Sequence, residues 1–487
     1  MVVPCNSDLS ITVDSPKPQK QKKVNLRKGQ RIKRKALKVL AGDTAKFGVT
    51  NPNAAGIDVG SEEMFVAVPP GRDPRPVRVF GAFTEDLHHL ADWLILCNIT
   101  TVVMESTGVY WIPLFQVLEA RGLEVCLVNA RHAKNLPGRK TDVVDCQWLQ
   151  KLHTFGLLAS SFRPPDEICV LRSYIRQRDT LIQDGACHIQ HMQKALTEMN
   201  VLLHKAVTDI TGTTGIAIVE AILAGERDPN VLASHRDPRC KKDKKTIAKA
   251  LQGDFRSEHL FILKQSFDSW KHSQQQIAEC DRQIEPLLEN FECQTCETLA
   301  KQKKADTKKN QVTFDLRNYL YQISGVDITE IPSIGSLSAL TIISEIGVDL
   351  SAWRTERHFS SWLGLCPDNR ISGGKVLSVR TRKVPSRVAN ILRLAARSLH
   401  KSQSALGSFF RRMKYKIGFQ AAITATAHKL ARIVYVMLKY RRQYDPSILQ
   451  EKNESNKITM LQNVTNLARK MGYQLIPVQN PEQAEVS

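Results

Sequence analysis

The sequence predicts an α/β plus α fold class, and three observations lead to it. Residues 54–129 alternate short β-branched runs with helical patterns. Residues 166–300 carry apolar residues at three-and-four spacing and hold few turn signals. Residues 324–445 form a final helical region. A chain of 487 residues is long enough for two to four such domains.

The elements of the α/β domain, residues 54–160, can be placed in order. Short connections make the first three strands an antiparallel meander: 54–60, 64–70 and 77–83. Two further strands are reached through helical crossovers and should run parallel to the first: 100–106 after helix 86–98, and 124–129 after helix 111–122. A last helix opens at Asp142. The expected order is β-β-β-α-β-α-β-α.

The helical remainder divides into a spacer and a C-terminal domain. Within the spacer, residues 166–300, two long apolar patterns predict a pair of antiparallel helices or a coiled coil: 171–203 and 260–291. A polar, Lys-rich linker over residues 301–323 leads to the helical domain at 324–445. Residues 446–487 form a tail.

The charge indicates a polyanionic partner. The net charge is +21, and the pI is about 9.5. Eleven Lys or Arg and no acid fall within residues 17–38, inside a Pro- and Gln-containing arm, residues 1–50, that we expect to be disordered. Eighteen Lys or Arg and no acid fall within residues 369–444, a region patterned to fold. Nucleic acid is the usual partner of so basic a protein.

Cysteine usage and hydropathy suggest a cytoplasmic, nucleoid-associated protein. The eleven cysteines are scattered and odd in number, which suits reduced thiols. No apolar run of about 18 residues and no apolar signal core is present, so neither a membrane partner nor secretion is expected. Cys293 and Cys296 form one close pair, a weak zinc pattern that the sequence leaves open.

Four carboxylates stand out when placed on this map. Asp58 lies inside the first strand, Glu105 ends the fourth, and Asp142 and Asp145 open the last helix. Each has a plain structural explanation, since Asp142 or Asp145 could complement a helix N-terminus and Glu105 could cap a helix. Together, four carboxylates at one edge of a sheet suit Mg²⁺ or Mn²⁺ and phosphodiester chemistry. The sequence therefore predicts a metal site formed by these four acids.

A second constellation lies in the C-terminal domain. Residues 328–347, "ITEIPSIGSLSALTIISEIG", resemble a helix-hairpin-helix, with Gly335 in the turn. Ser372 follows in "RISGGK", where the two glycines permit close backbone approach and Arg370 and Lys375 supply positive charge. A serine in such a loop could attack a phosphodiester. An ordinary helix turn and an ordinary "SGGK" turn are the competing interpretations.

Taken in series, these features resemble a known family. The order of elements and acids in residues 54–155 resembles the ribonuclease-H-like fold in its Holliday-junction-resolvase version. Adding the helical spacer, "IPSIG" and "GLCPDNRISGGK", residues 54–440 look like transposases of the one-hundred-and-ten insertion-sequence family, the bridge-RNA-guided recombinases. The resemblance places the family's acid tetrad on Asp58, Glu105, Asp142 and Asp145, and its serine nucleophile on Ser372.

The resemblance implies a DNA transposase, an enzyme that cuts and rejoins insertion-element DNA. Its implied partners are element-end and target DNA, a structured non-coding guide RNA, and further copies of the chain in a dimer or tetramer. Mg²⁺ or Mn²⁺ is the implied cofactor. The residues expected to contact nucleic acid are Arg139, Lys140, Gly335, Arg370, Gly373, Gly374, Lys375, Arg380, Arg382, Lys383 and Arg387.

Two alternatives remain open from the residues alone. A metal-dependent, structure-selective DNA nuclease would use the acids and water, with no covalent intermediate and with Ser372 merely structural. A non-catalytic nucleic-acid binder would retain the acids without using them.

Overall fold

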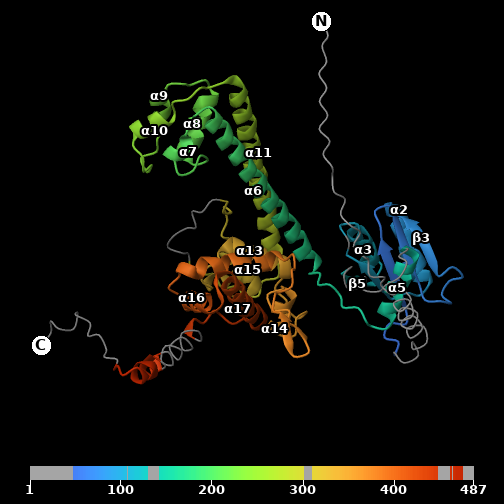
Figure 1. Cartoon of the computed structure of the whole chain (residues 1–487). Coiled ribbons are helices and arrows are strands. Elements are labelled where there is room, and N and C mark those ends of the chain that lie inside the picture. The colour runs from blue at the N-terminus through green and yellow to red at the C-terminus, as the bar shows by residue number, and fades with distance from the viewer. Residues whose placement is uncertain are drawn as a thin grey trace, which may run out of the picture. The chain divides into compact units, whose positions relative to one another are not determined.

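The computed structural model describes residues 48–106, 108–129, 142–300, 310–447, 461–462 and 464–474. It divides into two compact units, residues 1–163 and 164–487. The predicted arm at 1–50 lies almost wholly outside the described residues, as does the first part of the predicted linker at 301–323. Figure 1 labels many of the elements of both units.

The first unit is a five-stranded mixed sheet in the order β3-β2-β1-β4-β5. The strands are β1 (Ala54–Val59), β2 (Glu63–Ala67), β3 (Val77–Gly81), β4 (Thr101–Glu105) and β5 (Glu124–Val128). β1, β2 and β3 pair antiparallel, whereas β4 pairs parallel with β1 and β5 pairs parallel with β4. The predicted meander, crossovers and strand directions are confirmed.

Helices cover both faces of this sheet. α2 (Thr84–Leu96) and α3 (Trp111–Ala120) bury most of their leucines against one face, in a core that includes Ile57 and Met104. α5 (Asp142–Thr154) covers the other face, where Leu149 packs on Val103 and Val128. Side chains alternate between the two faces along a strand, so neighbouring residues of β1 and β4 serve different cores.

The second unit is built on two long helices, α6 (Asp166–Glu198) and α11 (Ser257–Asn290). Arg178 pairs with Asp281 near one end, and Glu198 pairs with His259 near the other, so the helices run antiparallel as predicted. Between them the chain forms four short helices at one end of the pair: α7 (Leu203–Ala206), α8 (Thr213–Leu223), α9 (Pro229–Ser234) and α10 (Lys244–Ala250).

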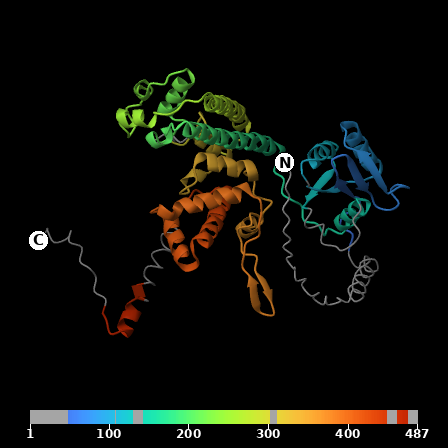
Figure 2. The same cartoon turned by 45° about the horizontal axis from the view of Figure 1, so that its top comes forward.

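The C-terminal helices belong to the same unit. They are α12 (Leu316–Ser324), α13 (Ser336–Ile346), α14 (Glu356–Trp362), α15 (Arg387–Ser398), α16 (Ala405–Ile417) and α17 (Phe419–Tyr440), with the hairpin β6 (Arg370–Ser372) and β7 (Lys375–Ser378). The hairpin projects from the helices in Figure 2. α17 is long and apolar enough to cross a membrane by length and composition, but half of its apolar window is buried inside the fold.

The predicted helix-hairpin-helix differs from the structure in its first half. Only one 3-10 turn, Ile328–Glu330, precedes the turn, and α13 follows it. The left-handed residue in the turn is Ser333, with φ of 78°, while Gly335 has φ of −95° and caps α13. Pro332 comes two residues after the 3-10 turn and disfavours a longer helix before it.

Candidate active site

α5 approaches the backbone of β1 closely at Gly56. A Cβ atom on Gly56 would overlap the backbone of Cys146 and Gln150, so only glycine lets the helix lie this close to the strand. Gly56 lies two residues before Asp58, and side chains two apart in a strand share a face. Asp58 therefore lies on the side of the sheet that α5 covers.

The C-terminal end of α5 is anchored by hydrogen bonds to the first residues of β1 and β4. The buried Gln150 side chain donates to the carbonyl of Ala54 at 3.3 Å. The ring of His153 shares a hydrogen bond of 2.9 Å with the hydroxyl of Thr101, and its carbonyl accepts from Asn51 at 2.8 Å. Because the C-terminal turn of α5 lies at the strand beginnings, its first turn lies toward the strand ends, where Asp58 and Glu105 are.

Burial controls the protonation of this anchor. Desolvation lowers the pKa of His153, opposed by the charge of Glu124. The neutral imidazole is therefore the form that the fold accommodates.

Asp58 and Glu105 lie on neighbouring parallel strands and follow the paired residues Ile57 and Met104. They are thus next in register, on one face. Glu105 is buried, with 8% of its surface exposed, and Asp58 is half-buried. A buried carboxylate is costly to ionise unless cations or hydrogen bonds compensate it.

Asp145 joins the same region from α5. Burial, with smaller contributions from the charges of Asp58 and Asp145, raises the pKa of the neighbouring Cys146 thiol to about 12. The charges of both carboxylates therefore reach one buried sulfur. Cys146 stays a neutral thiol at neutral pH, so it is a poor metal ligand beside the carboxylates.

The four predicted acids are only partly assembled. Asp142 is the first residue of α5 and is exposed. Within the described ranges, no three His, Cys, Asp or Glu side chains come close enough to hold a metal ion. The donor set still fits Mg²⁺ or Mn²⁺ in its chemistry, because carboxylate oxygens are the ligands these ions prefer. Mutual repulsion of four carboxylates favours separation until a cation joins them. Arg139 and Lys140 lie outside the described residues.

Ser372 is the last residue of β6, directly before a two-residue turn. It pairs with Lys375 across the hairpin. Gly373 and Gly374 have φ of 54° and 76°, the positive pair that characterises a type I′ turn. Ser372 and Lys375 are both exposed, so the hydroxyl is presented beside a cation. The side chain of Arg370 lies outside the described part of the chain.

The hairpin also exposes apolar side chains, a feature that the sequence analysis did not anticipate. Ile371, Val376, Leu377 and Val379 are each at least 61% exposed. An isolated two-stranded hairpin is marginally stable in water. The β-branched and apolar residues in "KVLSV", directly after "GG", are the signal from which this exposed strand could have been found.

The cations after the hairpin divide between exposed and engaged side chains. Arg380 and Lys383 are exposed. The guanidinium of Arg382 donates to the carbonyl of Ser361 at 2.6 Å, which ties the base of the hairpin to α14.

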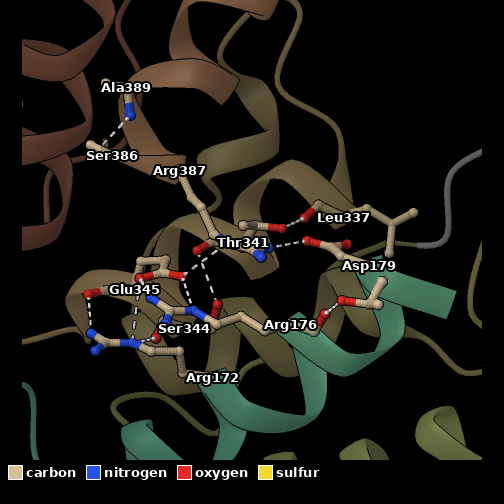
Figure 3. Close-up of polar contacts among 11 residues, drawn as sticks. Arg172, Arg176, Asp179, Leu337, Thr341, Ser344, Glu345, Ser386, Arg387 and Ala389 are labelled. Carbon is tan, nitrogen blue, oxygen red and sulfur yellow. Dashed lines mark hydrogen bonds and ion pairs between the residues drawn. The ribbon is translucent and has the colours of Figure 1, made fainter. Parts of the chain in front are cut away.

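Arg387, the first residue of α15, takes part in an internal network (Figure 3). Its guanidinium pairs with Asp179 of α6 at 2.7 Å and approaches Glu345 of α13 at 3.9 Å. Glu345 accepts a bidentate pair from Arg176, at 2.9 and 2.8 Å, and its backbone carbonyl accepts from Arg172. Arg387 therefore joins α15 to α6 and α13, and its phosphate contact stays a prediction.

Two family models match the chain over the ranges that hold these sites. A model of the DEDD type, described as "Transposase", matches residues 55–201, which include all four acids. A model described as "Transposase IS116/IS110/IS902 family" matches residues 327–411, which include Ser372. A search of curated proteins finds no match.

Proposed function

We propose that this chain, which belongs to the IS110 family of transposases, cuts and rejoins DNA through the serine of its exposed hairpin with help from its acidic site. That it is an enzyme acting on DNA in transposition follows from the family. The serine, the metal and the guide RNA are the finer parts of the proposal. The observation that carries it is the coexistence of the two matched segments, one with Asp58 and Glu105 at adjacent strand ends and one with an exposed serine.

Asp58, Glu105, Asp142 and Asp145 would hold Mg²⁺ or Mn²⁺. When bound, such an ion supplies Lewis-acid stabilisation of the negative charge that develops on a reacting phosphate. The anchoring of α5 by Gln150 and His153 supports this role, because it keeps Asp142 and Asp145 at the end of the sheet where Asp58 and Glu105 lie.

Ser372 would act as the nucleophile. Its Oγ gives up its proton and forms a bond to the DNA phosphorus, the P–O3′ bond breaks, and the 3′ oxygen leaves and takes up a proton. The product is a 5′-phosphoserine linkage. Because one phosphodiester replaces another, the reverse attack by a 3′-hydroxyl rejoins DNA without ATP. Lys375, which faces Ser372 across the turn, would stabilise the phosphate charge.

The exposed apolar side chains of the hairpin would pack against a partner molecule during the reaction. A further copy of the chain, in a dimer or tetramer, is the partner that the family implies. Guide RNA and DNA would contact the acid-free region 369–444. We expect the protein to work on cytoplasmic, nucleoid DNA.

Covalent trapping tests the proposal. Protein, Mg²⁺, the element's non-coding RNA and labelled DNA carrying the element ends are mixed and run on a denaturing gel. Ser372→Ala and Asp142→Ala should each abolish a shifted protein–DNA band. Ser378→Ala, a serine on the same hairpin, should retain it. Free cleaved DNA that persists in Ser372→Ala but not in Asp142→Ala would replace the proposal with a metal-dependent nuclease.

A further inference from the structure

The four short helices between α6 and α11 form a cap with its own apolar core. Ile218, Ile222, Leu232, Ile247 and Leu251 are fully buried there. The cap is thus a folded element and not a loose insertion. Its residues 202–256 lie between the two ranges that the family models match.

A basic loop on this cap is held in shape by internal hydrogen bonds. The guanidinium of Arg236 donates to the carbonyls of Lys242 and Cys240, each at 2.7 Å. The hydroxyl of Thr214, in the first turn of α8, accepts from the backbone of Asp237 at 2.9 Å. These bonds close residues 236–242 into a compact loop fastened to α8.

The loop and α10 together present five exposed lysines: Lys241, Lys242, Lys244, Lys245 and Lys249. In the part of the chain that the structure describes, none of their ammonium groups has a carboxylate partner. The two acids in residues 236–249 are engaged elsewhere, since Asp237 pairs with Arg239 at 2.9 Å and Asp243 accepts from the hydroxyl of Thr246. Seven cations against two acids therefore leave a local excess of positive charge.

This placement does not help the cap to fold. Lys244 and Lys245 occupy the first turn of α10, where the helix dipole disfavours positive charge. The neighbouring lysines also repel one another. Repulsion among these charges destabilises the free protein, because the loop holds them close together. A bound polyanion would offset this repulsion.

We propose that residues 236–249 of the cap bind the phosphodiester backbone of nucleic acid. Residues 236–249 contain no aromatic, Asn or Gln side chain that could stack on or read a base. The two arginines of the segment, Arg236 and Arg239, are engaged within the loop, and the lysines suit phosphate as point charges. The contact would therefore be chiefly with the backbone and depend little on base sequence. The site is separate from Ser372 and the four acids, and the inference holds whether or not Ser372 is the nucleophile. DNA and RNA share this chemistry, and the test separates them.

The first measurement is lysine acetylation footprinting of the full-length protein by mass spectrometry. The protein is treated alone, with a 30-base-pair duplex DNA of arbitrary sequence, and with a structured RNA of arbitrary sequence. Lys241, Lys242 and Lys245 should be protected several-fold by at least one of them, and the protecting nucleic acid identifies the source. Lys194, which pairs with Glu198, is the internal reference. Unchanged reactivity with both nucleic acids would overturn the proposal.

The second measurement compares two variants with equal charge change. One carries Lys241→Gln, Lys242→Gln and Lys245→Gln. The other carries Lys194→Gln, Lys264→Gln and Lys271→Gln, three lysines already paired with carboxylates. The cap variant should bind roughly tenfold or more weakly at 0.1 M salt, and its slope of log affinity against log salt should be shallower by about 2–3 than that of wild type. Equal affinities and slopes in the two variants would contradict the assignment.

Discussion

At the scale of single residues, Gly56 decides how the acidic site is formed. The backbone of α5 occupies the space that a side chain at this position would need. The approach brings the carboxylates of α5 to the same face of the sheet as Asp58 and Glu105. From the sequence, Gly56 is only one glycine in a strand, because the helix that meets it begins 86 residues later.

Gly56→Ala should therefore lower stability and weaken metal binding together. Forcing α5 away from β1 costs about 1–3 kcal/mol of unfolding free energy, as overpacking does elsewhere. Urea unfolding measures the first effect, and Mn²⁺ titration the second. Gly48→Ala is the control, because a Cβ there meets nothing within 4 Å. Equal unfolding midpoints in the two variants would show that α5 adjusts without cost.

His153 makes the anchor of α5 sensitive to pH. Its folded pKa lies below the unfolded value of 6.5, so the stability that the neutral imidazole contributes is present above pH 6.5. That contribution is lost as the pH falls below 6.5, because the unfolded chain then takes up the proton more readily. The melting temperature should fall between pH 7.5 and 5.5 by more in wild type than in His153→Gln. An identical fall in both proteins would assign the pH dependence to other groups.

At the scale of elements, the first unit was more predictable than the turn before α13. The helices and strands of the first unit follow from periodicity and turn signals, and the predicted order is the observed one. The turn before α13 was less readable, because Ser333 and not Gly335 adopts the left-handed conformation. Glycine marks where such a conformation is easy, but tertiary packing can impose it on another residue.

Substitutions at Gly373 should separate turn geometry from folding. Gly373→Asn should keep covalent capture, because Asn tolerates positive φ at the first position of a type I′ turn. Gly373→Val should reduce capture at least tenfold, because a β-branched residue is strained there. Because the turn is exposed and packs against no core, both variants should have nearly the melting temperature of wild type. Full capture by Gly373→Val would mean that the turn does not position Ser372.

The network around Glu345 should stabilise the second unit. Glu345 is 11% exposed in its side chain, and three arginines surround it. Glu345→Gln removes the charge that they share and should lower the unfolding free energy by about 1–3 kcal/mol. Glu258→Gln, in the exposed pair with Arg256, should change it by less than about 1 kcal/mol. Similar losses in both variants would show that the network contributes no more than a surface pair.

At the scale of the whole molecule, metal binding should raise the stability of the folded protein. An ion that binds only the folded protein adds about 2.7 kcal/mol at a concentration 100 times its dissociation constant. Mn²⁺ should therefore raise the melting temperature of wild type but not of Asp58→Asn. Glu62→Gln, an exposed acid in the turn after β1, should respond like wild type. A shift retained in Asp58→Asn would place the ion elsewhere.

The sequence by itself determined the element order of the first unit, the positive charge and the series of motifs that the family models match. These are properties of local periodicity, composition and spacing, which folding does not change. The three-dimensional fold was needed to show that α5 meets β1 at Gly56, that Arg387 pairs with Asp179, and that five lysines stand unpaired on a rigid cap. These depend on which distant segments come together, because a side chain's partners are set by packing across the fold and not by its neighbours in the chain.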